Sequence, residues 1–218
     1  MKVKQFTVNP FQTNCFVYYD ESSKEGVIID PGAYTKEEEN AIKDFIEENK
    51  INIKYIINTH GHIDHIMGNK FAKELFNVPM LIYKDDLFFV DNLIEQSQMF
   101  EIDASPSPPF DEYITEDTVI NIGNTKLNFI NTPGHSPGSV CIIDNENKNI
   151  FCGDLVFKNS VGRTDLPMGS FEVLIDSIKN KLFGKCSDDY TLYPGHMEPT
   201  TVLDEKNNNP FIKNPDFF

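Results

Sequence analysis

The 218-residue sequence contains no tryptophan and only four cysteines. Cys15, Cys141, Cys152 and Cys186 include no Cys-x-x-Cys pair, which argues against a disulfide framework and fits free thiols in a reducing compartment. No apolar run approaches the roughly 20 residues needed to span a bilayer, and the N-terminus lacks the apolar region and cleavage site of a signal peptide. We therefore expect a cytoplasmic protein that does not enter a membrane.

Positive charge is also scarce. Lysine and arginine number 19 against 34 aspartates and glutamates, so the formal net charge is −15. An acidic surface repels a phosphate backbone, which argues against a nucleic-acid partner. The chain is long enough to bury one substantial core and has neither a Gly/Ser-rich linker nor a low-complexity tract, so we predict a single domain over residues 1–218. The sequence does not indicate the oligomeric state.

The five histidines are unevenly distributed. Three of them fall within six residues, together with an aspartate, as His60-Gly61-His62-Ile63-Asp64-His65, and His135 and His196 each follow a Pro-Gly pair. A lone histidine is usually a structural or surface residue, but that interpretation does not account for three imidazoles and a carboxylate in six positions. Because clustered imidazoles and carboxylates are metal ligands, the sequence predicts a metal site.

Apolar strands are predicted immediately before these groups. Short apolar runs at 53–57, 126–130, 150–152 and 190–193 precede His60, His135, Asp154 and His196 respectively. Ligands from such distant strands can meet only if the strand ends gather at one edge of the packed sheets. We therefore predict two sheet-containing halves flanked by helices.

Helix signals are found between the strands. The capping box from Thr35 to Glu38 predicts a helix over about 35–50, and residues 69–76 and the segment after Ser170 also have helical spacing. The proline-rich segment 103–112 predicts a loop, which either connects the two halves or lies on the rim of a cleft. Residues 204–218 predict a polar turn followed by a tail that carries Phe211, Phe217 and Phe218.

Five imidazoles with Asp64 and Asp154 exceed the three or four protein ligands of one zinc ion. The number suits two metal ions that share a bridging carboxylate, hold a hydroxide between them and polarise a carbonyl group. The expected reaction is hydrolysis of an activated acyl or phosphoryl bond without a serine or cysteine nucleophile. Cys152 lies on the strand face of Asp154 and is expected to be a buried neighbour. Nitrogen and oxygen ligands alone admit zinc, iron or manganese.

The motifs as a set resemble those of the metallo-β-lactamase superfamily, and within it the glyoxalase II (hydroxyacylglutathione hydrolase) group. The family pattern T-H-x-H-x-D-H matches residues 59–65, and further matches are 29–32, 132–138, 152–154 and 193–196. The resemblance extends from about residue 14 to residue 200, almost the whole chain. It is specific for the fold and the metal site and less specific for the substrate.

The resemblance implies an α+β fold, the αββα sandwich, in which two packed mixed β-sheets are flanked by helices and the site lies at their edge. It implies two divalent metal ions, with zinc expected ahead of iron or manganese as the metal. Asp64 and Asp154 would be the catalytic carboxylates. The first ion would be bound by His60, His62 and His135, the second by Asp64, His65 and His196, and Asp154 would bridge them. Asp30 is expected either to orient a ligand or to satisfy a local turn.

Some features depart from the glyoxalase II pattern. Only 218 − 196 = 22 residues follow His196, whereas the longer enzymes of the group have a helical C-terminal region with basic residues for glutathione. Their Lys-x-Tyr segment is also replaced, by Arg163 and Asp165. The chain therefore resembles a short glyoxalase II-like form. Arg163 is expected either to bind a substrate carboxylate or to pair with Asp165.

The favoured function is a dinuclear hydrolase of a small-molecule thioester, because a thiolate leaves without a strong acid. The first alternative is a mononuclear iron persulfide dioxygenase, which shares this fold and would use His60, His135 and Asp154. A lactonase or phosphodiesterase on the same site is a further alternative. A purely structural site is disfavoured because closed zinc sites prefer thiolates.

Overall fold

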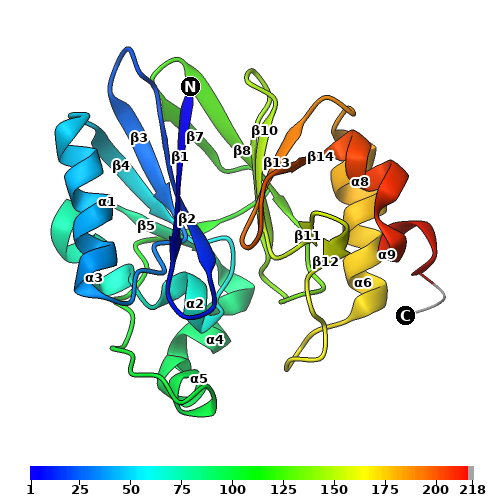
Figure 1. The fold of residues 1–218 in the computed structure, drawn as a ribbon, viewed down its shortest axis with the longest axis horizontal. Coiled ribbons are helices and arrows are strands. Elements are labelled where there is room, and N and C mark those ends of the chain that lie inside the picture. The colour runs from blue at the N-terminus through cyan, green and yellow to red at the C-terminus, as the bar shows by residue number, and fades with distance from the viewer. Residues whose placement is uncertain (216–218) are drawn as a thin grey trace.

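Two six-stranded β-sheets lie face to face, with helices over the outer face of each sheet (Figure 1). The computed structural model describes residues 1–215. The strands of the first sheet, in spatial order, are β1 (Lys2–Val8), β2 (Thr13–Tyr19), β3 (Glu25–Ile29), β4 (Asn52–Ile57), β5 (Met80–Tyr83) and β6 (Glu112–Ile114). Those of the second are β14 (Thr200–Thr201), β13 (Thr191–Pro194), β10 (Asn149–Gly153), β9 (Val140–Asp144), β8 (Thr125–Asn131) and β7 (Val119–Ile122).

Both sheets are mixed, as the resemblance implies. In the first sheet β1, β2 and β3 are antiparallel neighbours, whereas β3, β4, β5 and β6 run parallel. In the second sheet the only parallel pair within the described residues is β10 with β13. A separate hairpin of β11 (Val156–Phe157) and β12 (Ser160–Val161) follows β10.

Side-chain alternation along β2 shows how the layers form. Phe16 and Tyr18 point between the two sheets and pack with residues of the second sheet such as Phe151. Cys15 and Val17 point to the opposite face and pack beneath the helices. Successive side chains of a strand alternate between its faces, so this buried strand contributes to two hydrophobic layers.

Helices α1 (Lys36–Glu48) and α3 (Asn69–Phe76) cover the first sheet, close to the predicted ranges. Thr35 and Glu38 form the predicted capping box. The second sheet is covered by α6 (Phe171–Asp176), which Ser170 caps and which continues as a π-helix, η2 (Ser177–Leu182), and as α7 (Phe183–Lys185). The sequence did not predict the π-helical widening. In residues 1–215, no helix is both long and apolar enough to span a membrane.

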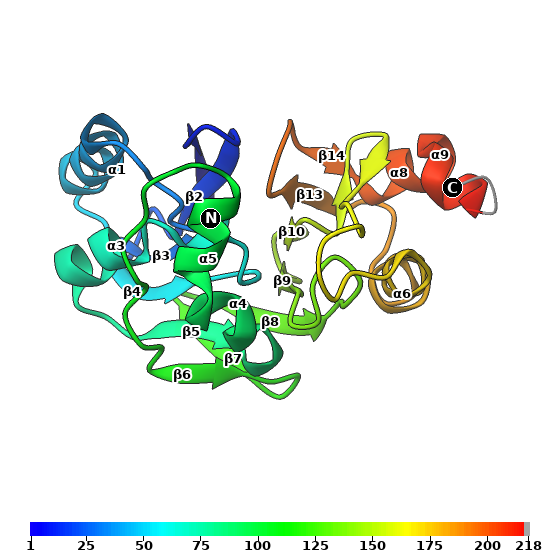
Figure 2. The same ribbon diagram turned by 90° about the horizontal axis from the view of Figure 1, so that it is seen from below.

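Short helices that the sequence analysis did not predict lie at the edge of the sandwich. They are α2 (Ile63–Ile66), the 3₁₀ turn η1 (Lys84–Asp86), α4 (Leu87–Asp91) and α5 (Leu93–Met99). Figure 2 shows α4 and α5 on the side of the first sheet. Ile63, Ile66 and Leu93 belong to a small buried hydrophobic cluster beneath these short helices. The proline-rich segment that follows has no regular structure up to β6.

The predicted polar turn after residue 204 is wrong. The chain forms α8 (Val202–Asn208) and α9 (Pro210–Lys213) instead. Thr201 and Asn209 cap the two helices, and buried Glu205 accepts hydrogen bonds from Thr200 Oγ1 and Asn209 Nδ2. These tertiary contacts stabilise helices whose local sequence is polar. Phe211 packs against the core under the second sheet, whereas Phe217 and Phe218 lie outside the described residues.

A buried hydrogen bond joins the two sheets. Tyr18 Oη of β2 donates to Asp144 Oδ2 of β9 at 2.6 Å, and both side chains are almost completely buried. Burial and the neighbouring carboxylate raise the pKa of Tyr18, so the phenol stays a donor.

We expect Tyr18→Phe to lower the free energy of unfolding by about 1–3 kcal/mol, because a carboxylate then loses a buried partner. Urea denaturation measures this. Tyr34→Phe, at an exposed tyrosine, is the control and should change stability by less than about 0.5 kcal/mol. Equal effects of the two substitutions would contradict the role given to the inter-sheet bond.

Candidate metal centre

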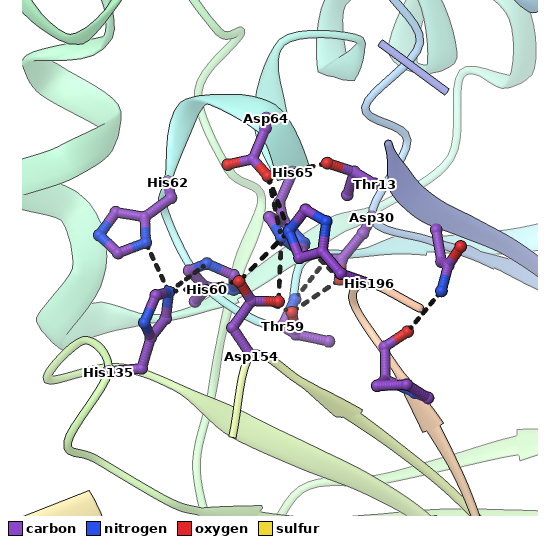
Figure 3. A network of polar contacts seen from close by, with 12 residues as sticks. Thr13, Asp30, Thr59, His60, His62, Asp64, His65, His135, Asp154 and His196 are labelled. Carbon is purple, nitrogen blue, oxygen red and sulfur yellow. Dashed lines mark hydrogen bonds and ion pairs between the residues drawn. The ribbon is translucent and has the colours of Figure 1, made fainter. Parts of the chain in front are cut away.

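The predicted ligands converge at one edge of the sandwich (Figure 3). His60 follows β4, and His62, Asp64 and His65 lie at or in α2. The strands β8, β10 and β13 point in the same direction, so the loops after them bring His135, Asp154 and His196 to this edge. The structure thus places all seven predicted ligand side chains in one cluster: His60, His62, Asp64, His65, His135, Asp154 and His196.

Three imidazoles form one half of the cluster. His135 Nε2 lies 2.8 Å from His62 Nδ1 and 3.2 Å from His60 Nε2. The ligand atoms of the three residues lie within 4.8 Å of one another, and all three side chains are buried. Nitrogen atoms at these positions can bind one cation together.

Carboxylates and imidazoles alternate in the other half. Asp64 Oδ2 lies 3.2 Å from His196 Nε2 and 3.4 Å from His65 Nε2. Asp154 lies between the halves, because its Oδ1 is 3.4 Å from His65 Nε2 and its Oδ2 is 3.6 Å from His135 Nε2. Its Oδ2 also lies 3.4 Å from His196 Nε2, so the carboxylate contacts both halves and occupies the position that a bridging ligand requires. Gly195 permits this approach, since a Cβ atom there would collide with Asp154 and His65.

The protonation tendencies of the two halves differ. Burial, reinforced by the neighbouring imidazoles, lowers the pKa of His62 to about 3 and holds that of His60 well below its usual value. Burial also disfavours the charged forms of His65 and His196, but Asp64 and Asp154 outweigh it and raise the pKa of both, that of His196 to about 10. The carboxylates thus create a field that stabilises positive charge in the second half.

Hydrogen bonds around the cluster determine which imidazole nitrogens carry lone pairs. Arg163 O accepts a hydrogen bond from His135 Nδ1 at 2.7 Å, and Asp30 Oδ2 accepts one from His65 Nδ1 at 2.9 Å. Thr59 Oγ1 donates to Asp30 at 2.7 Å, so its oxygen is left to accept from His60 Nδ1 at 3.1 Å. In the neutral form that binds a metal, the Nε2 atoms of these three histidines would therefore direct lone pairs into the cluster.

The cluster fits divalent metal ions. Within residues 1–215, the buried atoms His65 Nε2 and Asp154 Oδ1 make no hydrogen bond, although both are strong polar groups. A buried polar atom without a partner costs free energy, and a cation among these atoms would remove that cost. Neutral imidazole nitrogens and ionised carboxylates are the forms in which these residues bind metals.

Asp30 combines the two roles expected for it. Its Oδ1 accepts from the backbone N of Thr59 at 2.7 Å, and its Oδ2 accepts from Thr59 Oγ1 and His65 Nδ1. It therefore both satisfies the local backbone and orients His65. Cys152 is a buried neighbour, as expected, and burial raises the pKa of its thiol well above the usual value.

The turn between β1 and β2 and the start of β2 also support the cluster, which sequence reasoning missed. Thr13 Oγ1 donates to Asp64 Oδ2 at 2.8 Å, and Asn9 Nδ2 donates to the backbone oxygen of Asp64 at 2.8 Å. Asn14 Nδ2 donates to the backbone oxygens of Pro194 and Met197, on either side of His196. No local motif marks these residues, because their role depends on contacts across 51 to 183 positions.

Asp86 is a second residue that the sequence analysis missed. Its buried carboxylate accepts from Gly61 N and Ser136 Oγ at 2.8 and 2.7 Å, and it also accepts from Gly138 N. These contacts join the loop of His60 and His62 to the loop of His135. Asp85 precedes it with the same chemistry but is exposed, so sequence alone does not distinguish the two.

A cavity of about 360 Å³ opens onto the cluster. His62, Asp64, His135, Asp154 and His196 line one side, and residues of α4, α5 and the segment 163–167 line the others. Arg163 is among them, but its Nε and Nη2 donate to the Asp165 carboxylate at 2.7 and 2.8 Å. The structure therefore shows the ion pair that was one of the two alternatives for Arg163.

We expect Asp30→Asn to weaken metal binding about 10- to 100-fold, because an amide cannot accept from all three donors that the carboxylate serves. Asparagine tolerates the positive φ of this position, so the backbone is not strained. Competition with a chromophoric chelator measures the affinity, with Asp44→Asn on the exposed face of α1 as the control. An unchanged affinity would restrict Asp30 to the local turn.

Asp86→Asn should weaken metal binding about tenfold and lower the free energy of unfolding by about 1–3 kcal/mol, because one buried donor loses its acceptor. The matched control is Asp85→Asn at the exposed neighbour. A loss of stability with unchanged metal affinity would show that Asp86 supports the fold but not the ligand loops.

Comparison with known proteins agrees with this geometry. The model of the metallo-beta-lactamase superfamily matches residues 8–196. An uncharacterized protein of Aquifex aeolicus is 38% identical over 97% of both chains. The hydroxyacylglutathione hydrolase GloC of Haemophilus influenzae is 36% identical over 97% of this chain and 98% of its own.

Solved structures of the same size share the fold. The BLEG-1 B3 metallo-beta-lactamase superposes with a TM-score of 0.88 at 30% identity and covers 97% of this chain and 99% of its own. TTHA1623, solved in a di-iron-bound form, superposes with a TM-score of 0.85 at 28% identity. The match covers 96% of this chain and 100% of TTHA1623. The fold, the motifs and the family model agree, and the chain belongs to the metallo-β-lactamase superfamily.

Proposed function

We propose that the protein is a dinuclear metal-dependent hydrolase of thioesters, of the hydroxyacylglutathione hydrolase type. The observation that carries the proposal is a set of seven buried or half-buried candidate ligands facing a cavity whose other described lining residues supply no general acid. The similarity to a relative named as a hydroxyacylglutathione hydrolase supports a thioester as the substrate.

His60, His62 and His135 would hold one metal ion, and Asp64, His65 and His196 would hold the other. Asp154 would be shared between them, because its carboxylate contacts His65 and His196 in one half and His135 in the other. Two divalent ions in such a site lower the pKa of water between them and polarise a carbonyl oxygen. Zinc is the expected metal, and the di-iron form of TTHA1623 makes iron the leading alternative.

The residues around the ligands keep this arrangement in place. Asp30, Thr59 and the backbone oxygen of Arg163 orient three imidazoles, and Thr13 holds Asp64. Because the ligands are oriented before substrate binds, little reorganisation accompanies the reaction. Asp64 and Asp154, whose pKa values lie below the usual range, remain carboxylates at neutral pH.

The leaving group distinguishes a thioester from an amide. Outside the cluster, the ionisable residues lining the cavity are Glu95, an exposed carboxylate, and Arg163, which stays charged. Neither is a general acid for an amine leaving group. A thiolate leaves without protonation, because a thiol is far more acidic than an amine. The cavity therefore suits a thioester better than a β-lactam, whose leaving group is an amine.

A mononuclear iron dioxygenase using His60, His135 and Asp154 is the second candidate. The ligand atoms of these residues do approach one another, because His135 Nε2 lies 3.2 Å from His60 Nε2 and 3.6 Å from Asp154 Oδ2. That arrangement would leave four further ligand residues without a metal, His65 with its unpartnered buried Nε2 among them. The dinuclear site uses all of them and is therefore favoured.

Metal content and activity test the proposal together. Protein purified without chelator should contain two ions per chain and hydrolyse S-lactoylglutathione and simple acetyl thioesters, and chelation should abolish the activity. Asp154→Ala should bind fewer ions and lose at least about 100-fold in kcat/KM, because both halves lose a ligand. Leu203→Ala, at an exposed residue of α8, is the control.

The outcomes separate the candidates. One iron per chain with oxygen uptake on glutathione persulfide would replace the hydrolase by the dioxygenase. Efficient turnover of a cephalosporin with inert thioesters would contradict the argument from the leaving group.

A further inference from the structure

The cavity walls are apolar at the mouth, where the part of a substrate farthest from the candidate metal centre would lie. Phe88 of α4 and Met99 of α5 line the cavity although they are 52% and 65% exposed. Phe89, which is buried, packs its ring 4.7 Å from the ring of His62. Exposed apolar side chains at the mouth of a cavity favour binding of an apolar group, because a ligand would remove them from water.

The amide side chains of the cavity are already used within the protein. Gln96 Oε1 accepts from Ile63 N at 3.0 Å, and its Nε2 donates to Phe89 O at 2.7 Å. Asn92 Nδ2 donates to Phe88 O at 2.6 Å. Gln96 thus fixes α5 against the loop of the ligands, and a polar substrate would have to compete with these bonds.

The charges of the cavity disfavour an anionic thiol. Arg163 is the only cationic side chain, other than imidazoles, among the lining residues, and the Asp165 carboxylate pairs with its Nε and Nη2. Glu95 adds a negative charge to the wall, and the net charge of the chain is −15. Glutathione carries two carboxylates and one ammonium group, and the one guanidinium that could attract its carboxylates is already paired with Asp165.

We infer that this site acts on thioesters whose thiol half is neutral and apolar, in preference to glutathione thioesters. The inference rests on the proposed thioester hydrolase function and narrows its substrate class. The thiol half would lie against Phe88 and Met99, and the carbonyl group would lie at the cluster. The specificity would thus differ from the one for which the Haemophilus influenzae relative is named.

Two substrates with the same acyl group test the inference: S-lactoylglutathione and the lactoyl thioester of benzyl mercaptan. Any preference then comes from the thiol half. We expect kcat/KM to be at least about tenfold higher for the benzyl thioester, because burial of a phenyl group has at least this effect on binding.

Variants assign the preference to the cavity. Phe88→Ala should lower kcat/KM for the benzyl thioester about tenfold and change that for S-lactoylglutathione less than twofold. Leu203→Ala removes a similarly exposed side chain, 47% against 52%, far along the chain on α8 and is the matched control. Asp165→Asn, which releases Arg163, should lower the ratio of benzyl to glutathione activity about threefold.

The outcomes distinguish this inference from the proposed function. A metal-loaded protein that hydrolyses neither thioester would contradict the thioester hydrolase itself. Preferred hydrolysis of S-lactoylglutathione would leave that function intact and overturn the apolar substrate class. A Phe88→Ala variant that loses both activities equally would also overturn the inference, because the wall would then not select the thiol half.

Discussion

The burial or half-burial of five imidazoles and two carboxylates in mutual contact is the constraint on which the rest of the structure depends. Such a cluster is stable only if a positive charge compensates the carboxylates and occupies the imidazole lone pairs. Asp64 and Asp154 raise the pKa of His65 and His196, which shows where positive charge is stabilised. Metal ions satisfy both requirements at once, and this explains why the ligands come from so many loops.

The scaffold orients each ligand through its other polar atom. Asp30 binds His65, Thr13 binds Asp64, and Asp86 joins the two loops that carry the imidazole half. These contacts connect the first sheet, the second sheet and the short helices at their edge. The sandwich therefore does more than bring strand ends together, because it also selects the tautomers and directions of the side chains.

In the function proposed here, reactivity and selectivity would come from different parts of the molecule. The cluster would supply the positive charge needed for hydrolysis, whereas the cavity walls contribute mostly apolar surface and one cation that is already paired. On the proposed function, the acidic chain would bind an acyl group at the cluster while offering little attraction to an anionic thiol. The segment with Phe88 and Met99 belongs to α4 and α5, which carry none of the family motifs.

Much of the fold and of the candidate site could be predicted from local patterns. The capping box at Thr35 and Glu38 predicted α1, and the motif around His60 predicted a metal cluster, because both depend on residues close in sequence. The same approach was wrong for residues 204–209, where Glu205 and Asn209 form a helix through buried contacts. It also missed α4 and α5, whose positions depend on Gln96 bonding to the loop of His62.

The sequence by itself singled out the seven candidate ligand residues and the strands that precede them. Ligand chemistry and strand periodicity are properties of residues and their sequence neighbours, so they can be recognised from the sequence alone. Only the tertiary structure decided that Asp86 rather than Asp85 supports the ligands, that Thr13 holds Asp64, and that Asp165 pairs with Arg163. Those roles depend on which groups meet across the fold and which of them lose contact with water.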